Sequence, residues 1–243
     1  MKAYIGCSGF YNSHWKGIFY PEDLPIGNWF TYYCEHFNTF EINSTFYKFP
    51  TIKVLDNWYN KTPLRFLFAV KAPREITHLK KFNDCSQKIN EFYNTCEIGL
   101  KDKLGCILFQ FPPSFKYSKE LLELIINSLK SSFQNVVEFR NTSWWNPEVF
   151  NAFKENNITF CSVNHPQLPE DIIVNTSSVY IRLHGNPKIF YSSYSEEYLK
   201  SLHNRITQNV KIKNSFVFFN NTASTAGILN AQYFNLIYHS NFN

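Results

Sequence analysis

The segment CILFQFPPSFKYSKELLELIINSLKSSFQNVVEFR, residues 106–140, decides the fold class. It opens with the apolar run 106–111 and closes with a second apolar run, 136–140. Between them, apolar residues recur at helical spacing behind Ser118, which is a favourable helix N-cap residue. These apolar residues are Leu121, Leu122, Ile125, Ile126 and Leu129. The segment therefore predicts a strand, a helix and a second strand, the repeating unit of a parallel α/β fold.

The same order repeats along the whole chain. Short apolar runs bounded by turn residues occupy 3–8, 39–43, 66–71, 106–111, 136–140, 158–163, 179–184 and 215–220. Amphipathic segments lie at 27–37, 52–61, 83–98, 118–133, 146–157, 195–211 and 224–239. Eight strand-like runs, each followed by an amphipathic segment or a long connection, predict one domain over residues 1–243, a TIM-type (β/α)8 barrel. We expect an irregular sixth βα unit, because residues 164–177 lack a helical pattern.

A doubly wound open sheet is the alternative fold. It would usually have fewer strands and a glycine-rich first turn. The first turn here reads GCSG at 6–9, which does not match G-x-G-x-x-G, and the chain contains no P-loop motif. The barrel is therefore the better interpretation.

The bulk composition favours a cytoplasmic protein. Its net charge of +5 is a mild excess that only modestly favours anionic partners. The six cysteines are scattered and form no C-x-x-C pair, as expected of free thiols in a reducing cytosol. No signal peptide is evident, and no apolar stretch approaches the roughly 18–20 residues of a membrane span. We expect no membrane association.

Polar residues interrupt the predicted strands at their carboxyl ends. Three strands carry a polar pair spaced i, i+2, and three more carry a single polar residue. The pairs are Glu41 with Asn43, Glu138 with Arg140, and Arg182 with His184; the single residues are Lys71, Gln110 and Asn220. Because strand side chains alternate with period two, both members of a pair point into the barrel. Sites in this fold lie at the carboxyl ends of the strands, so we expect these side chains to share one pocket.

The chemistry of this set favours an anionic ligand. Lys71, Arg140 and Arg182 supply the positive charge that binds phosphate or carboxylate groups. If the protein is an enzyme, the candidate catalytic residues are Glu41 or Glu138 as the base and His184 as its acid/base partner. The structural alternative is that these charges form buried ion pairs inside the barrel. No metal site is predicted, since no H-E-x-x-H or H-x-H pattern occurs.

Two loops extend the predicted mouth. Residues 71–82, KAPREITHLKKF, bring Arg74 and His78 beside Lys71 and predict a basic rim. Residues 11–25, YNSHWKGIFYPEDLP, leave the first strand on the same side, so we expect their aromatic side chains to cover the pocket or stack on a base.

Seven ordered blocks of the sequence resemble the YecE-like family, also called domain of unknown function 72. The blocks are IGCSGFYNSHWKGIFYP, FEINSTFYKFP, FAVKAPREITH, LFQFPPSF, VEFRNTSWW, YIRLHG and FFNNTASTAGILNA. The resemblance implies a TIM-type barrel related to metal-dependent endonucleases and sugar isomerases, without specifying a reaction. Matched by position, it implies a role for Glu41, Asn43, Ser44, Lys71, Arg74, His78, Gln110, Glu138, Arg140, Arg182, His184 and Asn220. The chain departs from the family at Asn164, where relatives tend to carry Asp.

Three functional hypotheses follow from the sequence. The first is a pocket for a small anionic or phosphorylated ligand, with hydrolase or lyase activity if the protein is an enzyme. Its ligand-binding residues are Asn43, Lys71, Arg74, His78, Gln110, Arg140, Arg182 and Asn220. The second is a nucleic-acid-binding or endonuclease-like barrel. The third is a non-catalytic barrel that binds a ligand or partner. The sequence identifies no cofactor.

Overall fold

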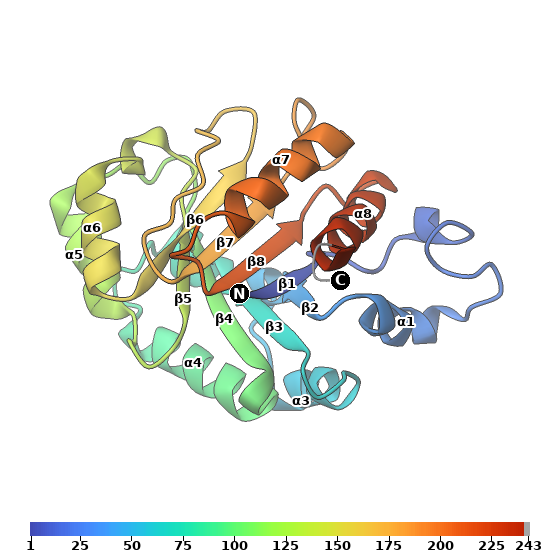
Figure 1. The fold of residues 1–243 in the computed structure, drawn as a ribbon. Coiled ribbons are helices and arrows are strands. Elements are labelled where there is room, and N and C mark those ends of the chain that lie inside the picture. Colours follow the sequence, from blue (N-terminus) through green and yellow to red (C-terminus); the bar gives the residue numbers. More distant parts are fainter. Residues whose placement is uncertain (241–243) are drawn as a thin grey trace.

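The structure, a computed structural model, describes residues 1–240 and contains an eight-stranded parallel sheet rolled into a nearly closed, TIM-like barrel (Figure 1). The strands are β1 (Lys2–Cys7), β2 (Thr39–Ile42), β3 (Leu67–Lys71), β4 (Leu104–Gln110), β5 (Asn135–Glu138), β6 (Ile158–Asn164), β7 (Ser178–Leu183) and β8 (Asn214–Phe219). Neighbours in the sheet follow the order β1-β8-β7-β6-β5-β4-β3-β2. The predicted fold class is confirmed.

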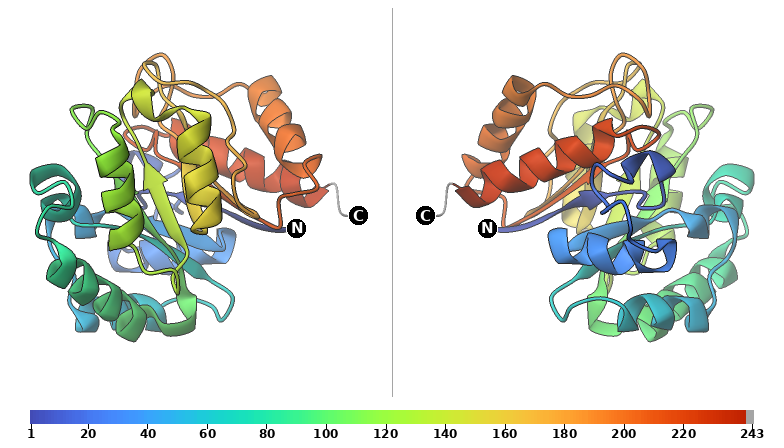
Figure 2. Two further views of the ribbon diagram at one scale, coloured as in Figure 1. Left: turned by 90° about the vertical axis from the view of Figure 1, so that its left-hand side faces the viewer. Right: turned by 90° about the vertical axis from the view of Figure 1, so that its right-hand side faces the viewer.

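Helices form the outer layer of the barrel (Figure 2). They are α1 (Trp29–His36), α2 (Ser44–Tyr47), α3 (Ile52–Asn60), α4 (Ser86–Leu100), α5 (Lys119–Ser128), α6 (Pro147–Glu155), α7 (Glu196–Thr207) and α8 (Ala226–Ser240). The predicted cap of α5 is present, since Ser118 accepts a hydrogen bond from the backbone N–H of Leu121. No helix lies between β6 and β7, so the sixth βα unit is irregular as predicted.

Alternation along the strands divides the buried apolar residues into two cores. One core lies between sheet and helices and includes Ile42, Phe139 and Leu183, the residues that separate the members of the polar pairs. The other fills the barrel interior and consists of Ala69, Cys106, Leu108, Val136, Cys161, Val163, Tyr180, Phe216 and Phe218. The polar pairs therefore lie above an apolar floor.

The barrel has a seam between β1 and β2, which share no backbone ladder among the described residues. Side chains bridge this seam instead. The amide of Asn38 accepts from the N–H of Ile5 at 3.1 Å and donates to the carbonyl of Ala3 at 2.7 Å. The hydroxyl of Tyr33 accepts from the N–H of Cys7 at 2.6 Å and donates to the carbonyl of Thr39 at 3.0 Å. These bonds satisfy edge groups that would otherwise be buried without partners.

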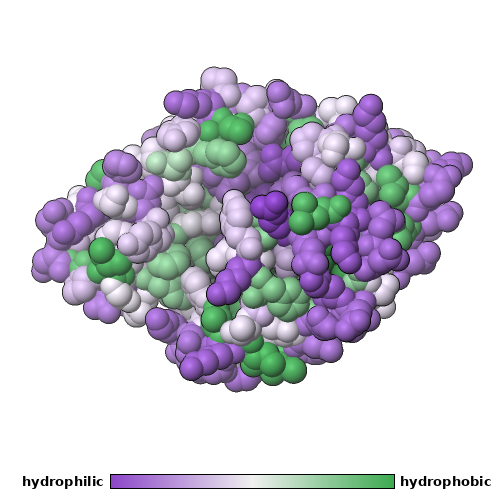
Figure 3. Space-filling view, turned by 180° about the vertical axis from the view of Figure 1, so that it is seen from behind, coloured by the Kyte–Doolittle hydropathy of each residue, from purple (hydrophilic) through white to green (hydrophobic). Residues whose placement is uncertain are grey.

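The remaining general expectations concern thiols and the membrane. All six cysteines are free, as predicted, and all six are buried. Among residues 1–240, no helix is long and apolar enough to cross a membrane. On the face seen from behind, hydrophobic residues appear as separate patches among hydrophilic ones (Figure 3).

Candidate functional site

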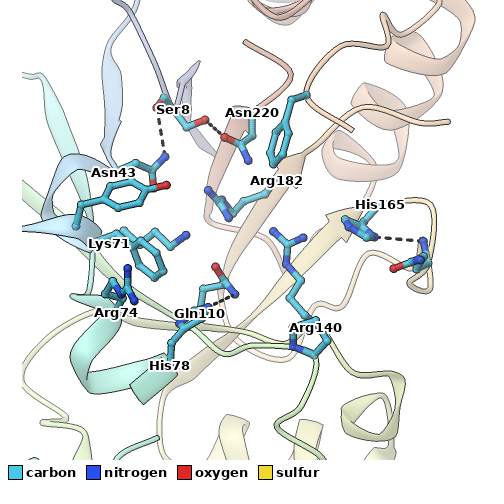
Figure 4. Close-up of a pocket in the computed structure, with 15 residues that line it drawn as sticks. Ser8, Asn43, Lys71, Arg74, His78, Gln110, Arg140, His165, Arg182 and Asn220 are labelled. Atoms are coloured by element: carbon cyan, nitrogen blue, oxygen red, sulfur yellow. Dashed lines mark hydrogen bonds between the residues drawn. The ribbon is translucent and has the colours of Figure 1, made fainter. Parts of the chain in front are cut away.

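A pocket of about 660 Å³ opens at the carboxyl ends of the strands (Figure 4). It is lined by Ser8, Asn43, Phe46, Tyr47, Lys71, Arg74, His78, Gln110, Pro113, Arg140, His165, Gln167, Arg182, Phe190 and Asn220. No Asp or Glu is among them. The lining comes from strand ends and from the loops that follow them, as in other barrels of this type.

Below the pocket, an ion-pair network crosses the barrel interior. Arg182 donates two hydrogen bonds to Glu41, from Nε at 3.0 Å and from Nη2 at 2.7 Å. Its Nη1 donates to Glu138 at 2.6 Å. Tyr180 adds a hydrogen bond to Glu41 at 2.5 Å. Both carboxylates are fully buried, and burying them without such partners would be very costly.

The network reaches the pocket wall through Arg140. Its Nε donates to Glu138 at 2.5 Å, and its Nη2 lies 3.0 Å from Nε2 of His184. Burial alone would raise the pKa of Glu138, but Arg140 and Arg182 hold it well below the usual range. Glu138 is therefore ionised at neutral pH, and its carboxylate fixes both guanidinium groups in place.

His184 is a neutral link in this network. Burial and the nearby charge of Arg140 lower its pKa well below the usual value, against the opposing effect of the Glu138 carboxylate, whose Oε1 lies 3.5 Å from Nε2. Because Arg140 can only donate, Nε2 accepts and the single proton lies on Nδ1. The Asn220 amide lies 2.6 Å from Nδ1 and also contacts the hydroxyl of Ser8. In the structure the amide nitrogen faces Nδ1 and the amide oxygen accepts from Ser8, so a proton on Nδ1 requires a half-turn of the amide that exchanges these two atoms.

Lys71 is held at the end of β3. Its carbonyl accepts a hydrogen bond from the hydroxyl of Thr45 at 2.6 Å, and its Nζ lies 4.3 Å from the centre of the Phe46 ring. Burial and the positive charge of Arg182 lower the pKa of Lys71 to about 8. Figure 4 shows its amine pointing into the same space as Arg140 and Arg182.

His78 forms the next part of the wall, in the π-helical segment Glu75–Leu79. Its Nδ1 contacts the hydroxyl of Thr77 at 2.9 Å, and its Nε2 lies 3.4 Å from the amide nitrogen of Gln110. Burial, then the charge of Lys71, lowers the pKa of His78 to about 4. His78 therefore faces the pocket as a neutral imidazole at neutral pH.

The charges of the site do not balance at the pocket surface. Glu41 and Glu138 are neutralised by Arg182 and Arg140. Lys71 and Arg74 have no such partner, since neither forms an ion pair with any carboxylate of residues 1–240. The pocket therefore carries uncompensated positive charge.

The structure brings all eight predicted ligand-binding residues into this one pocket. The three predicted catalytic residues, Glu41, Glu138 and His184, are fully buried and do not line it. Their catalytic roles stay predictions.

Sequence reasoning missed seven lining residues: Ser8, Phe46, Tyr47, Pro113, His165, Gln167 and Phe190. For Phe46 and Tyr47 a signal existed, because they follow the Glu41–Asn43 pair within one short block. His165 follows β6 directly, so its position at a strand end was also a usable signal.

The expectation for the aromatic loop 11–25 was wrong. None of its residues lines the pocket. Trp15 is buried and its indole N–H donates to the carbonyl of Ser224, while Tyr20 stacks on Trp29. Trp15 and Tyr20 are part of the buried core, where they pack against α1 and the loop after β8. Phe46, Tyr47 and Phe190 provide the aromatic surface instead.

A metal centre has no ready-made ligand set in the described part of the chain. No group of three or more His, Cys, Asp or Glu side chains in residues 1–240 lies close enough together to hold an ion. The imidazole of His184 is occupied on both nitrogens, by Arg140 and Asn220.

Comparisons with known proteins agree on one family. Residues 4–241 match the family described as "Protein of unknown function DUF72". A DUF72 family protein from Thermotoga maritima superposes with a TM-score of 0.89 at 31% identity, over 98% of this chain and 100% of that chain. One from Enterococcus faecalis gives 0.82 at 19% identity, over 98% and 95%. The UPF0759 protein YunF of Bacillus subtilis is 25% identical over 206 residues, 76% of this chain and 71% of YunF.

Fold and site together define a TIM-like barrel with a cation-lined pocket at its mouth. More narrowly, the chain belongs to the DUF72 family, as its motif blocks suggested.

Proposed function

We propose that this protein binds a small anionic ligand, most suitably one with a phosphate group, in the mouth pocket. The observation that carries the proposal is the uncompensated charge of Lys71 and Arg74 in a pocket whose lining contains no carboxylate. An anion bound there supplies the missing negative charge, and charge-assisted hydrogen bonds are the strong ones.

The shape of the site also supports a small ligand. A pocket of about 660 Å³ has the size of a small-molecule site rather than of a shallow contact surface. Arg140 and Arg182 are each held by Glu138, so their planar donors keep a fixed orientation before the ligand arrives. Such preorganised guanidinium groups suit the oxygen atoms of a phosphate.

Hydrolase or lyase chemistry on such a ligand requires a group at the pocket surface that can move a proton. His78 meets this requirement, because it is neutral and faces the pocket. Glu41, Glu138 and His184 lie behind Arg182 and Arg140. In this arrangement they act as positioning residues that hold the two guanidinium groups.

Titration with inorganic phosphate tests the proposal. A ligand at about 100 times its Kd stabilises the folded state by about 2.7 kcal/mol, which a rise in Tm reports. We expect Arg74→Gln to weaken phosphate binding about tenfold, as expected from the loss of one charge-assisted hydrogen bond. Lys80→Gln is the matched control, because Lys80 is exposed on the same loop and does not line the pocket. Equal affinities for the two variants would contradict the proposal.

A second function, binding of single-stranded nucleic acid, is favoured by aromatic rings at the pocket rim. Tyr47 is 77% exposed and Phe190 is 42% exposed, which is unusual for such large rings, and both border the cationic pocket. Exposed rings beside cations are typical of surfaces on which bases stack. This function predicts that binding of an oligonucleotide weakens steeply with salt. Absent or salt-independent binding would exclude it.

A further inference from the structure

Lys71 differs from every other cation in the pocket. The other three cations are arginines, and a guanidinium group is not deprotonated in proteins. The amine of Lys71 is the one cationic group of the lining that can lose its proton near neutral pH, and burial together with the neighbouring Arg182 favours this loss. A neutral amine is a nucleophile, whereas an ammonium group is not.

The position of Lys71 is also fixed. Its backbone carbonyl is hydrogen-bonded to Thr45, and the next residue, Ala72, donates its N–H to the carbonyl of Leu108 at 2.8 Å. The side chain lies against the face of Phe46, whose ring meets His78 edge-on at 4.8 Å between ring centres. The amine is therefore directed into the pocket from a rigid strand end, beside a neutral imidazole.

We propose that Lys71 forms an imine with its ligand, and that the ligand is a phosphorylated aldehyde or ketone. This inference rests on the proposed function, because the phosphate group is placed on Arg74, Arg140 and Arg182 while the carbonyl group reaches Lys71. It adds the reacting residue and the substrate class to that function.

The step balances without an oxidant or reductant. The amine of Lys71 adds to the carbonyl carbon, and the carbonyl oxygen gains a proton to give a carbinolamine. The nitrogen then loses its remaining proton and the hydroxyl group leaves as water, forming the C=N bond. His78 lines the same pocket as a neutral imidazole and can carry the proton from nitrogen to the departing oxygen.

Trapping by sodium borohydride tests the proposal. Borohydride reduces an imine to a stable secondary amine, which peptide mass mapping locates on the chain. The probes are glycolaldehyde phosphate and glycolaldehyde, which differ only in the phosphate group. We expect glycolaldehyde phosphate to label Lys71 at least about tenfold more than glycolaldehyde does. One charge-assisted hydrogen bond to the phosphate group strengthens binding by about that factor. Inorganic phosphate should protect Lys71.

Variants separate this chemistry from nonspecific lysine labelling. Lys71→Arg keeps a positive charge but cannot form an imine, so it should lose the label, with its fold checked by circular dichroism. Lys80→Arg, on the exposed part of the same loop, should keep the label at Lys71. Labelling of Lys80 as strong as that of Lys71 would overturn the inference.

The failures of the two proposals are distinguishable. If phosphate raises the Tm in an Arg74-dependent manner but Lys71 is never trapped, the imine is excluded and anion binding stands. If both probes label Lys71 equally and phosphate gives no protection, the phosphorylated substrate class is excluded.

Discussion

Arg182 of β7 and Glu41 of β2, 141 residues apart in sequence, form a two-point ion pair across the barrel interior. Both side chains are almost wholly buried, at 1% and 0% exposure. The guanidinium and the carboxylate therefore bind each other in place of water. Arg182 lines the pocket while Glu41 holds its guanidinium group from below. This arrangement makes one carboxylate important to the stability of the fold and to the shape of the pocket.

We expect Glu41→Gln to lower the free energy of unfolding by about 3–5 kcal/mol, because Arg182 and Arg140 then share the single carboxylate of Glu138 and one buried positive charge is left unbalanced. Denaturation in urea, followed by circular dichroism, measures the loss. Glu75→Gln is the control, since Glu75 pairs with Lys88 near the surface, where removing one partner has little effect. If Glu41→Gln unfolds at the wild-type urea concentration, the ion pair is not a structural element, and a direct catalytic role for Glu41 gains support.

The seam between β1 and β2 gives a second prediction. A Cβ atom on Gly6 would lie 2.3 Å from the carbonyl oxygen of Thr39 and 2.7 Å from the hydroxyl of Tyr33. Gly6→Ala therefore forces the seam apart and breaks the Tyr33 bridge. We expect a loss of about 3 kcal/mol in the free energy of unfolding, at the upper end for overpacking.

Gly27→Ala is the matched control for Gly6→Ala. A Cβ atom at Gly27 meets nothing within 4 Å, so its stability should be unchanged or slightly raised. Equal melting temperatures for the two variants would show that the seam tolerates a methyl group.

The sequence predicted the barrel and the pocket residues for the same reason. Strand side chains alternate with period two, so a polar pair such as Glu41 and Asn43 was expected to share the interior face. In the structure β2 ends at Ile42, and Asn43 follows it but still donates to Glu41 at 3.0 Å. Parallel strands place their carboxyl ends at one end of a barrel, so polar residues from different strands had to meet there. Neither step depends on side-chain conformation.

The sequence could not predict how deep each side chain lies in the barrel or which distant side chains come close to it. Glu41 and Glu138 lie one layer below Asn43 and Arg140, and the long side chain of Arg182 fills the space above them. Whether a carboxylate meets a ligand or an arginine is decided by that packing rather than by strand alternation.

The seam depends in the same way on contacts in space. Tyr33 and Asn38 reach β1 from the segments before β2, and no local pattern in the sequence indicates that they replace a ladder.

The pH dependence of anion binding tests the charge of Lys71. The pKa of Lys71 is lowered to about 8, so its positive charge is present below that pH and lost above it. Sulfate keeps its charge throughout this range, so its affinity should fall between about pH 7 and about pH 9, approaching a tenfold loss. Isothermal titration calorimetry measures the change. In Lys71→Arg the fall should be absent, because arginine stays protonated.

The stability of the protein should fall on mild acidification because of histidines at the site. Burial lowers the pKa of His78 to about 4, lowers that of His165, and lowers that of His184 well below its usual value. In the unfolded chain these groups protonate near pH 6.5, so the unfolded state binds more protons below that pH and stability decreases as pH falls. The decrease should start near pH 6.5 and continue towards about pH 4.5, before carboxylates such as Glu138 contribute.

Urea midpoints at a series of pH values measure this dependence. His184→Gln removes one of the titrating groups and should flatten the curve in that window, even though the variant starts from a lower stability. His14→Gln is the control, because His14 is exposed and is not among the residues that line the pocket. A midpoint that stays constant from about pH 6.5 to about pH 4.5 in the wild-type protein would show that these histidines take up protons in the folded state as readily as in the unfolded one. His184 would then be protonated beside Arg140, and the neutral link between Arg140 and Asn220 would have to be abandoned.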